Sequence, residues 1–335
     1  MRRGPMLLTV FTFLTMLSGC ASQQEQPQLS RQETGAAIQN AQETEAALRN
    51  ETEITAEPEE EEMIFIEAIP DITESAAVSP TTTLRPDWSS YFDGLNGAAV
   101  IFDPREPVFQ VYNENLADTR RSPCSTFKII SSLAGLERGA INRENSSRPW
   151  SGEGFWNDDW NRDMDFPTAF RTSCVWYYRQ VIDDIGPEIM EETLDELQYG
   201  NCDVSDWEGH LNNNNSNPAL TGFWLESSLK ISPREQTEVL ERIFGSSSRY
   251  SQDVQALLEE VMFLPESSDE TCRIYGKTGM GKSGGIVVDC WYTGFADMDH
   301  RIYFCIYLGE TANQNISSTQ AREIAVSLTK DYFLY

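Results

Sequence analysis

Histidine and basic residues are scarce in this 335-residue chain. Its only histidines are His210 and His300, and no two cysteines have C-x-x-C spacing, so neither a zinc site nor a serine-histidine pair is favoured. It has 25 Lys and Arg against 53 Asp and Glu, a formal net charge of −28, and no basic stripe. Nucleic acid binding is therefore disfavoured, because it depends on a basic surface. A small molecule is the expected partner.

The N-terminus has no apolar run long enough to span a membrane. The run at 6–17 is well short of the roughly 20 residues that a spanning helix needs, so it favours a signal peptide. It ends in Leu17-Ser18-Gly19-Cys20, which resembles a bacterial lipobox. That resemblance implies a lipoprotein-type signal peptide over 1–20, a lipid on Cys20, and an exported protein anchored to the outer face of the bacterial cell membrane. An ordinary secretory signal cut near Ala21 is the alternative.

The next segment is poor in apolar residues. Between 21 and 85 there are 14 Asp and Glu against 3 Lys and Arg. Such a composition cannot bury enough apolar surface to offset the entropy of ordering, so residues 21–86 are predicted to be an acidic disordered tether. Residues 87–335 contain all eight tryptophans and are long enough for one globular domain with a large core.

Six cysteines lie in this domain, and an exported protein can form disulfides. Cys290 and Cys305 fall on two predicted strands joined by a short turn, so they could face each other across the ladder. Buried free thiols are the equal alternative, and the sequence leaves both open.

Strand patterns at both ends of the domain enclose a mostly helical middle. A predicted β-hairpin comes first, and three strands and a final helix come last. This order predicts an α/β (α+β) fold, with an antiparallel β-sheet flanked by helices plus a mostly helical lobe. The hairpin is 96–104 and 108–113, the middle is about 140–262, the later strands are 272–280, 284–297 and 301–309, and the final helix is 317–333.

The stretch PCSTFKIISSL (123–133) places Ser125 three residues ahead of Lys128. The apolar pattern predicts a helix that begins at Ser125 and ends near Gly139, so both side chains would share one face. A serine hydroxyl needs a base to become a nucleophile, and a lysine held neutral can be that base. Amides at the helix start can also stabilise an oxyanion. The alternative is a helix cap followed by a surface lysine.

Four further segments follow this stretch in order. They are Ser173-Cys174-Val175, Tyr199-Gly200-Asn201, the segment FWLESSLKIS at 223–232, and Lys277-Thr278-Gly279. Together with Ser125 and Lys128 they resemble the penicillin-recognising serine enzymes, and within them the class D (oxacillinase-type) serine β-lactamases. The resemblance covers essentially all of 88–335 and implies a β-lactamase/transpeptidase-like fold.

The resemblance implies roles for the residues around the serine. Ser125 would be the acylated nucleophile, and Lys128, N-carboxylated by carbon dioxide, would be the general base. Ser173 would pass a proton toward the β-lactam nitrogen, with Lys277 nearby. Val175 and Leu225 would form apolar walls around the carbamate, and Trp224 would donate a hydrogen bond to it. Tyr199-Gly200-Asn201 is expected only to shape a turn.

The resemblance also implies how substrate binds. The strand that carries Lys277, Thr278 and Gly279 would be an edge strand beside the substrate. Lys277 and Thr278 would face the substrate carboxylate, with Arg322 of the last helix as a candidate partner. The backbone N–H groups of Ser125 and Met280 would form the oxyanion hole. No metal and no diffusible cofactor are expected.

Some features depart from the family pattern or have no assigned role. Cys124 and Cys174 stand beside the two serines, where small residues such as Ala are usual. Glu226 partly resembles the glutamate of the class A E-x-x-L-N motif, but Lys230 and Val175 replace the asparagines of class A, so class D fits better. The acidic loops 151–165 and 203–222 are candidates for shaping substrate preference.

Three functions are compatible with these motifs. The first is hydrolysis of β-lactam antibiotics, which would confer resistance. The second is a sensor domain that binds β-lactams and stays acylated; sensors commonly carry a polar residue at the position of Val175 and belong to multi-span membrane proteins. The third is a D,D-peptidase, which would favour Asn at position 175. Val175 therefore favours hydrolysis.

Overall fold

A computed structural model describes residues 82–211, 216–311 and 314–333, and the structural statements below refer to these residues. The predicted signal peptide, Cys20 and residues 21–81 of the predicted tether lie outside them. No helix in the described ranges combines the length and the apolar character needed to cross a membrane.

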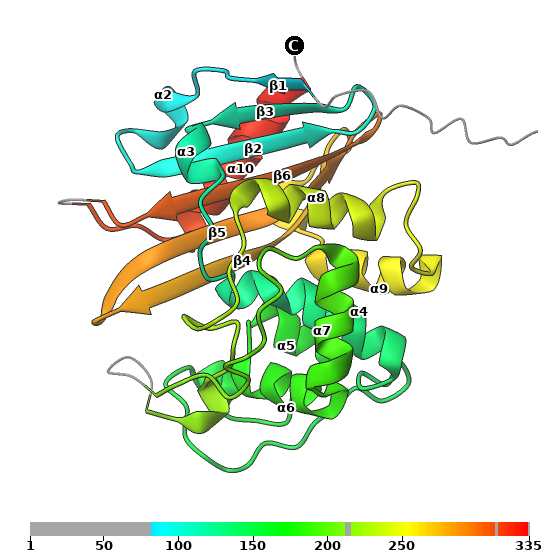
Figure 1. Cartoon of the computed structure of the whole chain (residues 1–335). Helices are drawn as coiled ribbons and strands as arrows, with labels where there is room; N and C mark the ends of the chain where they lie inside the picture. Colours follow the sequence, from blue (N-terminus) through cyan, green and yellow to red (C-terminus); the bar gives the residue numbers. More distant parts are fainter. Residues whose placement is uncertain (1–81, 212–215, 312–313, 334–335) are drawn as a thin grey trace, which may run out of the picture. The chain divides into compact units, whose positions relative to one another are not determined.

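One mixed sheet organises the domain (Figure 1). Its strand order is β1-β3-β2-β6-β5-β4, and all neighbouring strands are antiparallel except the parallel pair β1 and β3. Strand β4 is therefore an edge strand, as predicted. The strands are β1 (Thr82–Leu84), β2 (Gly97–Asp103), β3 (Val108–Tyr112), β4 (Arg273–Ser283), β5 (Ile286–Asp297) and β6 (Arg301–Gly309).

Strand β1 extends the sheet beyond the predicted domain boundary. Residues 82–84 were assigned to the tether, but Thr82, Thr83 and Leu84 pair with Val108, Phe109 and Gln110 of β3. This pairing was not predictable from composition, because it depends on an unpaired edge of β3 being available.

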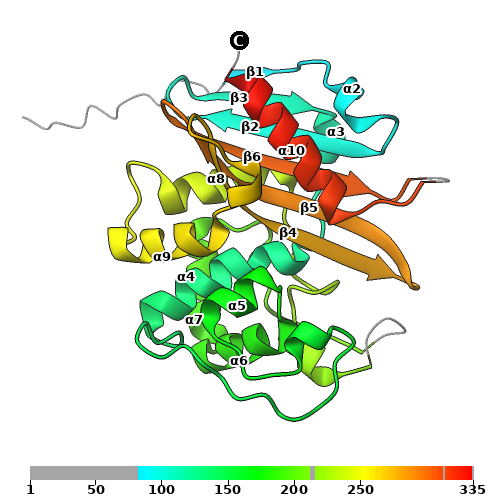
Figure 2. The same cartoon turned by 180° about the vertical axis from the view of Figure 1, so that it is seen from behind.

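Helices cover both faces of the sheet. Figure 2 shows α10 (Ser318–Tyr332) along one face, and Figure 1 shows α8 (Pro233–Phe244) on the other, beside the helical lobe. Alternate strand residues point to the two sides: Ile302 and Phe304 pack with the core under α10, whereas Tyr303 packs with the core of the helical lobe. The α/β fold class and its mostly helical lobe are confirmed.

The predicted helices lie close to their predicted bounds. Ser232 begins α8 with a capping box that includes Glu235, and Ser317 caps α10, because serine hydroxyls accept hydrogen bonds from the first free amides of a helix. The remaining helices are α2 (Ser89–Phe92), α3 (Glu114–Ala117), α4 (Lys128–Arg138), α5 (Phe166–Arg171), α6 (Val175–Ile185), α7 (Pro187–Leu197), α9 (Gln252–Met262) and the 3-10 turns η1 (Cys124–Phe127), η2 (Asp158–Trp160), η3 (Pro218–Leu220) and η4 (Pro265–Ser267).

The six cysteines of the domain are all free thiols. The possible pairing of Cys290 with Cys305 is wrong, because Cys290 is opposite Leu308 and Cys305 is opposite Thr293 in the β5–β6 register. An offset of three positions sends the two side chains to opposite faces.

Candidate active site

Ser125 lies in the 3-10 turn η1 rather than at the start of an α-helix, which begins three residues later at Lys128. The residue before it, Cys124, has a left-handed backbone with φ of 50°, a conformation that costs energy in a non-glycine residue. The turn brings the serine out of the helix while the i, i+3 spacing to Lys128 is kept.

Lys128 is buried, with 1% of its surface exposed. Its Nζ lies 3.0 Å from the Oγ of Ser125, so the two side chains predicted to share a face do meet. Burial lowers the pKa of Lys128 to about 8, because a charged amine loses its hydration there. The ring of Tyr178 lies under this nitrogen, 5.2 Å from Nζ to the ring centroid. The surface-lysine alternative is therefore wrong.

A second serine–lysine pair joins the helical lobe to the edge strand. Lys277 of β4 is 4% exposed, and its Nζ donates to the Oγ of Ser173 at 3.0 Å and to the carbonyl of Thr278 at 3.0 Å. Ser173 has a left-handed backbone, with φ of 58°. Burial, reinforced by the nearby charge of Lys128, lowers the pKa of Lys277 well below its usual range.

Glycines let strand β4 pack closely on the turn that carries Ser125. A Cβ added to Gly279 would stand 3.0 Å from the Pro123 carbonyl oxygen, and one added to Gly281 would stand 3.0 Å from the Sγ of Cys124. Both distances are shorter than ordinary carbon contacts. Larger side chains at either position would push the strand away from Ser125.

Trp224 is fully buried beside the same turn. Its carbonyl accepts the N–H of Cys124 at 3.1 Å, and its indole stacks on Phe127 with ring centroids 6.1 Å apart. Its Nε1 is one of five buried side-chain polar atoms in the described ranges that lack a hydrogen-bond partner. An unpaired buried N–H costs about 1–3 kcal/mol, so this donor is suited to a group that binds there.

Two of the cavities along strand β4 are lined by residues predicted for the site. One of about 490 Å³ has Val175, Leu225 and Met280 in its lining, together with residues of the loops 151–165 and 203–222. These loops therefore wall the space beside Val175, Leu225 and Met280. Met280 is 42% exposed toward solvent.

The second cavity, of about 330 Å³, is lined by Lys277, Thr278 and Arg322 among others. The structure thus brings the candidate arginine of α10 to the same cavity as the K-T-G strand. Arg322 also forms an ion pair with Glu266, with Nη1 and Oε1 3.3 Å apart, a partner that the sequence did not predict.

Metal binding and thiol reactivity have little support among these residues. No group of three His, Cys, Asp or Glu in the described ranges is arranged to hold a metal ion. Burial raises the pKa of the Cys174 thiol to about 11, and Cys124 is buried with its pKa raised even further, by burial first and then by the Asp289 charge. Both thiols therefore stay protonated near neutral pH.

Three residues around the site carried no sequence signal. Tyr178 lies under Lys128, Phe170 lies under Lys277 with its ring centroid 5.7 Å from Nζ, and Ser122 hydrogen-bonds the Trp224 carbonyl at 3.0 Å. Aromatic and serine residues are common in any core, so only the fold reveals them. Tyr199-Gly200-Asn201 shapes a turn, as predicted, since Asn201 hydrogen-bonds the backbone of Lys230 and Ser228.

Ser125 beside the buried Lys128, in a helical lobe packed on a six-stranded sheet, is the arrangement expected from the resemblance to the penicillin-recognising serine proteins. The chain matches the penicillin binding protein transpeptidase domain family over residues 94–330. It is 32% identical over 248 residues to the probable beta-lactamase YbxI of Bacillus subtilis (strain 168), which covers 72% of this chain and 83% of that protein. The chain therefore belongs to the class D serine β-lactamases within this family.

Regulatory proteins are also among its relatives. BlaR1 of Bacillus licheniformis is 28% identical over 252 residues, but the match spans only 39% of that protein. The solved C-terminal domain of the Bacillus licheniformis BlaR penicillin-receptor matches with a TM-score of 0.66 and 27% identity, over 77% of this chain and 99% of that one. Class D beta-lactamase BAT-2 matches with a TM-score of 0.62 and 28% identity, over 74% of this chain and 95% of that one.

Proposed function

We propose that this protein hydrolyses β-lactam antibiotics through an acyl-enzyme on Ser125 and so protects its host cell. The observation that carries the proposal is the 3.0 Å contact between Ser125 Oγ and the buried Nζ of Lys128. A lysine with its pKa lowered to about 8 is neutral in part of the population near pH 7–8, and only the neutral amine can accept a proton.

In the acylation step, Ser125 Oγ attacks the β-lactam carbonyl and loses its proton to the base at Lys128. The N–H groups of Ser125 and Met280 stabilise the oxyanion. The lactam C–N bond then breaks, and its nitrogen takes a proton through Ser173, whose Oγ is 3.0 Å from Lys277 Nζ. In the deacylation step, water gives a proton to the base at Lys128 as its oxygen attacks the ester carbonyl, the ester C–O bond breaks, and that proton returns to Ser125 Oγ.

The residues around Lys128 fit a carbamate formed from carbon dioxide. Carboxylation requires a neutral amine, and burial lowers the pKa of Lys128 to about 8. The partnerless Nε1 of Trp224 would donate to it, and Val175 and Leu225 would shield it from water. Such a group would supply an anionic base for proton transfer in place of the amine.

Carbamate formation can be measured without turnover. With carbon-13 bicarbonate, we expect a lysine carbamate resonance in the NMR spectrum of the wild type and none in Lys128→Ala. Trp224→Phe should weaken the resonance, whereas Trp291→Phe, which removes another buried and partnerless indole N–H, should not. A wild-type spectrum without the resonance would count against carboxylation.

The substrate carboxylate is expected to bind in the 330 Å³ cavity. Lys277, Thr278 and Arg322 line it, together with Arg171 and Glu266 among others. Arg322 would exchange its contact with Glu266 for one with the substrate.

Turnover decides between hydrolysis and sensing. The domain should hydrolyse a chromogenic cephalosporin or a penicillin with multiple turnovers per Ser125, faster with bicarbonate, and Ser125→Ala should abolish the reaction. A sensor, favoured by the likeness to BlaR1, would instead give one equivalent of stable acyl-protein by mass spectrometry. Cleavage of D-Ala-D-Ala peptides with no β-lactam turnover would indicate a D,D-peptidase.

As part of the same proposal, residues 1–20 direct export and Cys20 carries a lipid that anchors the protein to the outer face of the bacterial cell membrane. The acidic segment that follows acts as a tether. The mass of the mature N-terminus tests this, since cleavage near Ala21 without lipid would contradict it.

A further inference from the structure

The turn that contains Trp224 and Leu225 lies between the segment leading to Ser125 and strand β4, and it contacts both. Glu226 stands where these contacts converge. It has a left-handed backbone, with φ of 55°, and backbone strain of this kind in a non-glycine residue is retained where surrounding contacts enforce it.

The backbone of Glu226 is tied to the serine segment. Its N–H donates to the Oγ of Ser122 at 2.8 Å, and the Ser122 hydroxyl donates to the carbonyl of Trp224 at 3.0 Å. Ser122 is only 2% exposed and stands three residues before Ser125. Together with the bond from Cys124 N–H to the Trp224 carbonyl, these contacts fix the turn against the serine segment.

The side chain of Glu226 is tied to the edge strand. Its Oε1 accepts the backbone N–H of Lys282 at 2.5 Å. The β4–β5 register shifts between Gly281 and Lys282, so the regular ladder is interrupted at this point. A carboxylate that holds the Lys282 amide therefore supports the strand where its register with β5 shifts, two residues from Met280.

We propose that Glu226, together with Ser122, is a positioning residue that sets the distance between the serine turn and strand β4. This inference rests on the proposed acyl transfer, because the two elements carry the two amides of the oxyanion hole. The carboxylate acts through the Lys282 amide and takes no proton in the reaction. It therefore differs from a glutamate that serves as a deacylation base.

Glutamine separates these roles, because Glu226→Gln keeps an oxygen acceptor for the Lys282 amide but cannot act as a base. We would compare Glu226→Gln, Glu226→Ala and Ser122→Ala with Ser131→Ala. The control removes another buried serine hydroxyl, which bonds only the Phe127 carbonyl within the first turn of α4. We would measure the rate of acylation by a fluorescent penicillin and the rate of turnover. We would also measure the affinity for an arylboronic acid, which forms a tetrahedral adduct with serine.

We expect Glu226→Ala and Ser122→Ala to lower the acylation rate and the boronic acid affinity by about 10- to 100-fold. Glu226→Gln should stay within about threefold of wild type, and Ser131→Ala should lose thermal stability only. Unchanged acylation in Glu226→Ala would overturn the proposal. If Glu226→Gln were acylated as slowly as Glu226→Ala, the proposal would also be overturned, because the reaction would then need the charge of Glu226 or its action as a base.

Hydrogen exchange of the Lys282 amide keeps this test independent of the enzyme's activity. It should be faster in Glu226→Ala than in Glu226→Gln, whatever the protein does with β-lactams. If the wild type is acylated and never released, hydrolysis is wrong while the positioning role is still decided by acylation and exchange. Equal exchange in the two variants would overturn the positioning role alone.

Discussion

Ser125 and Ser173 each contact a lysine that the fold has removed from water. Lys128 and Lys277 are nearly inaccessible, although a lysine loses a large hydration energy on burial. Neither has a carboxylate partner among the described residues, and burial is the main cause of both lowered pKa values. Burying these two amines therefore costs stability, and it lowers the pKa of both.

This cost predicts that Lys128→Met stabilises the protein while abolishing acylation. At pH 7 in carbon dioxide-free buffer, we expect the free energy of unfolding to rise by about 1–3 kcal/mol. The folded pKa of about 8 lies below the unfolded value, so the unfolded chain binds more protons between about pH 8 and pH 10.5 and wild-type stability rises across that range. The gain in the variant should thus be largest below pH 8 and shrink toward pH 10.5.

Urea denaturation at several pH values measures this difference. Lys230→Met, at a partly exposed lysine, is the control for replacing a lysine by methionine. A Lys128→Met protein less stable than wild type at pH 7 would contradict the explanation.

At the scale of elements, close contact between β4 and η1 decides the geometry of the site. Gly281 faces the Sγ of Cys124, and Asp289 of the neighbouring strand is also close to it. Cys124 therefore fills the space between turn and strand as a small apolar side chain. This gives a packing reason for a cysteine where the family usually has a smaller residue.

We predict that Gly281→Ala lowers the free energy of unfolding by about 1–3 kcal/mol. Its Cβ would stand 3.0 Å from Cys124 Sγ, so removing the sulfur in Cys124→Ala should restore at least half of the loss in the double variant. A double-mutant cycle by chemical denaturation measures this coupling. Additive effects would show that the two side chains do not compete for the same space.

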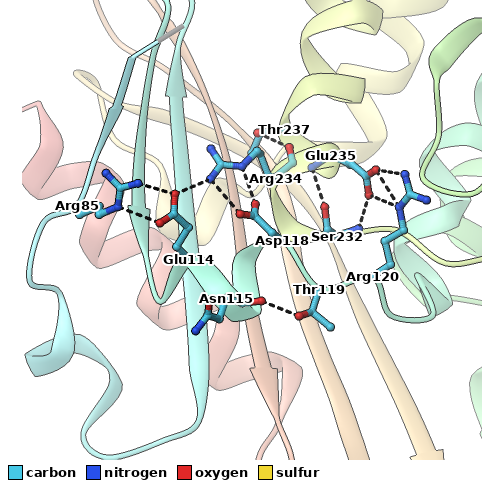
Figure 3. Close-up of polar contacts among 10 residues, drawn as sticks. All are labelled: Arg85, Glu114, Asn115, Asp118, Thr119, Arg120, Ser232, Arg234, Glu235 and Thr237. Atoms are coloured by element: carbon cyan, nitrogen blue, oxygen red, sulfur yellow. Dashed lines mark hydrogen bonds and ion pairs between the residues drawn. The ribbon is translucent and has the colours of Figure 1, made fainter.

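At the scale of the whole described domain, ion pairs join segments that are distant in sequence. Figure 3 shows Glu114 of α3 between Arg85, just after β1, and Arg234 of α8, while Asp118 also binds Arg234. Arg234 Nε is 2.6 Å from Asp118 Oδ1, and its guanidinium lies over the ring of Phe109. The side chain of Arg234 is 18% exposed and that of Arg85 is 63% exposed.

We expect burial to decide how much each arginine contributes to the free energy of unfolding. We expect Arg234→Ala to lower the free energy of unfolding by about 1–2 kcal/mol, because partly desolvated ion pairs and ring contacts are lost together. Arg85→Ala, in the same network, should leave the free energy of unfolding nearly unchanged, since exposed pairs are screened by water. Thermal denaturation of the two variants measures both losses of stability, and activity per acylated site is measured alongside. Equal losses of stability in the two variants would contradict the role of burial.

The sequence by itself determined the later strands, the final helix and one of the two serine–lysine contacts, that of Ser125 with Lys128. Periodic apolar residues placed α10 and the later strands within a few residues, because helix and strand repeats are local properties of the chain. The S-x-x-K spacing likewise put Ser125 and Lys128 on one face, since i and i+3 side chains meet within one turn.

Only the tertiary structure decided which distant segments meet. The contacts of Lys277 with Ser173, of Glu226 with Ser122 and of Gly281 with Cys124 all join residues more than 100 positions apart, and no local pattern specifies them. Burial of Lys128 also depends on the helices and strand packed around it, so its lowered pKa is a property of the fold. Pairing of β1 with β3 has the same origin, because an open strand edge exists only after the sheet has formed.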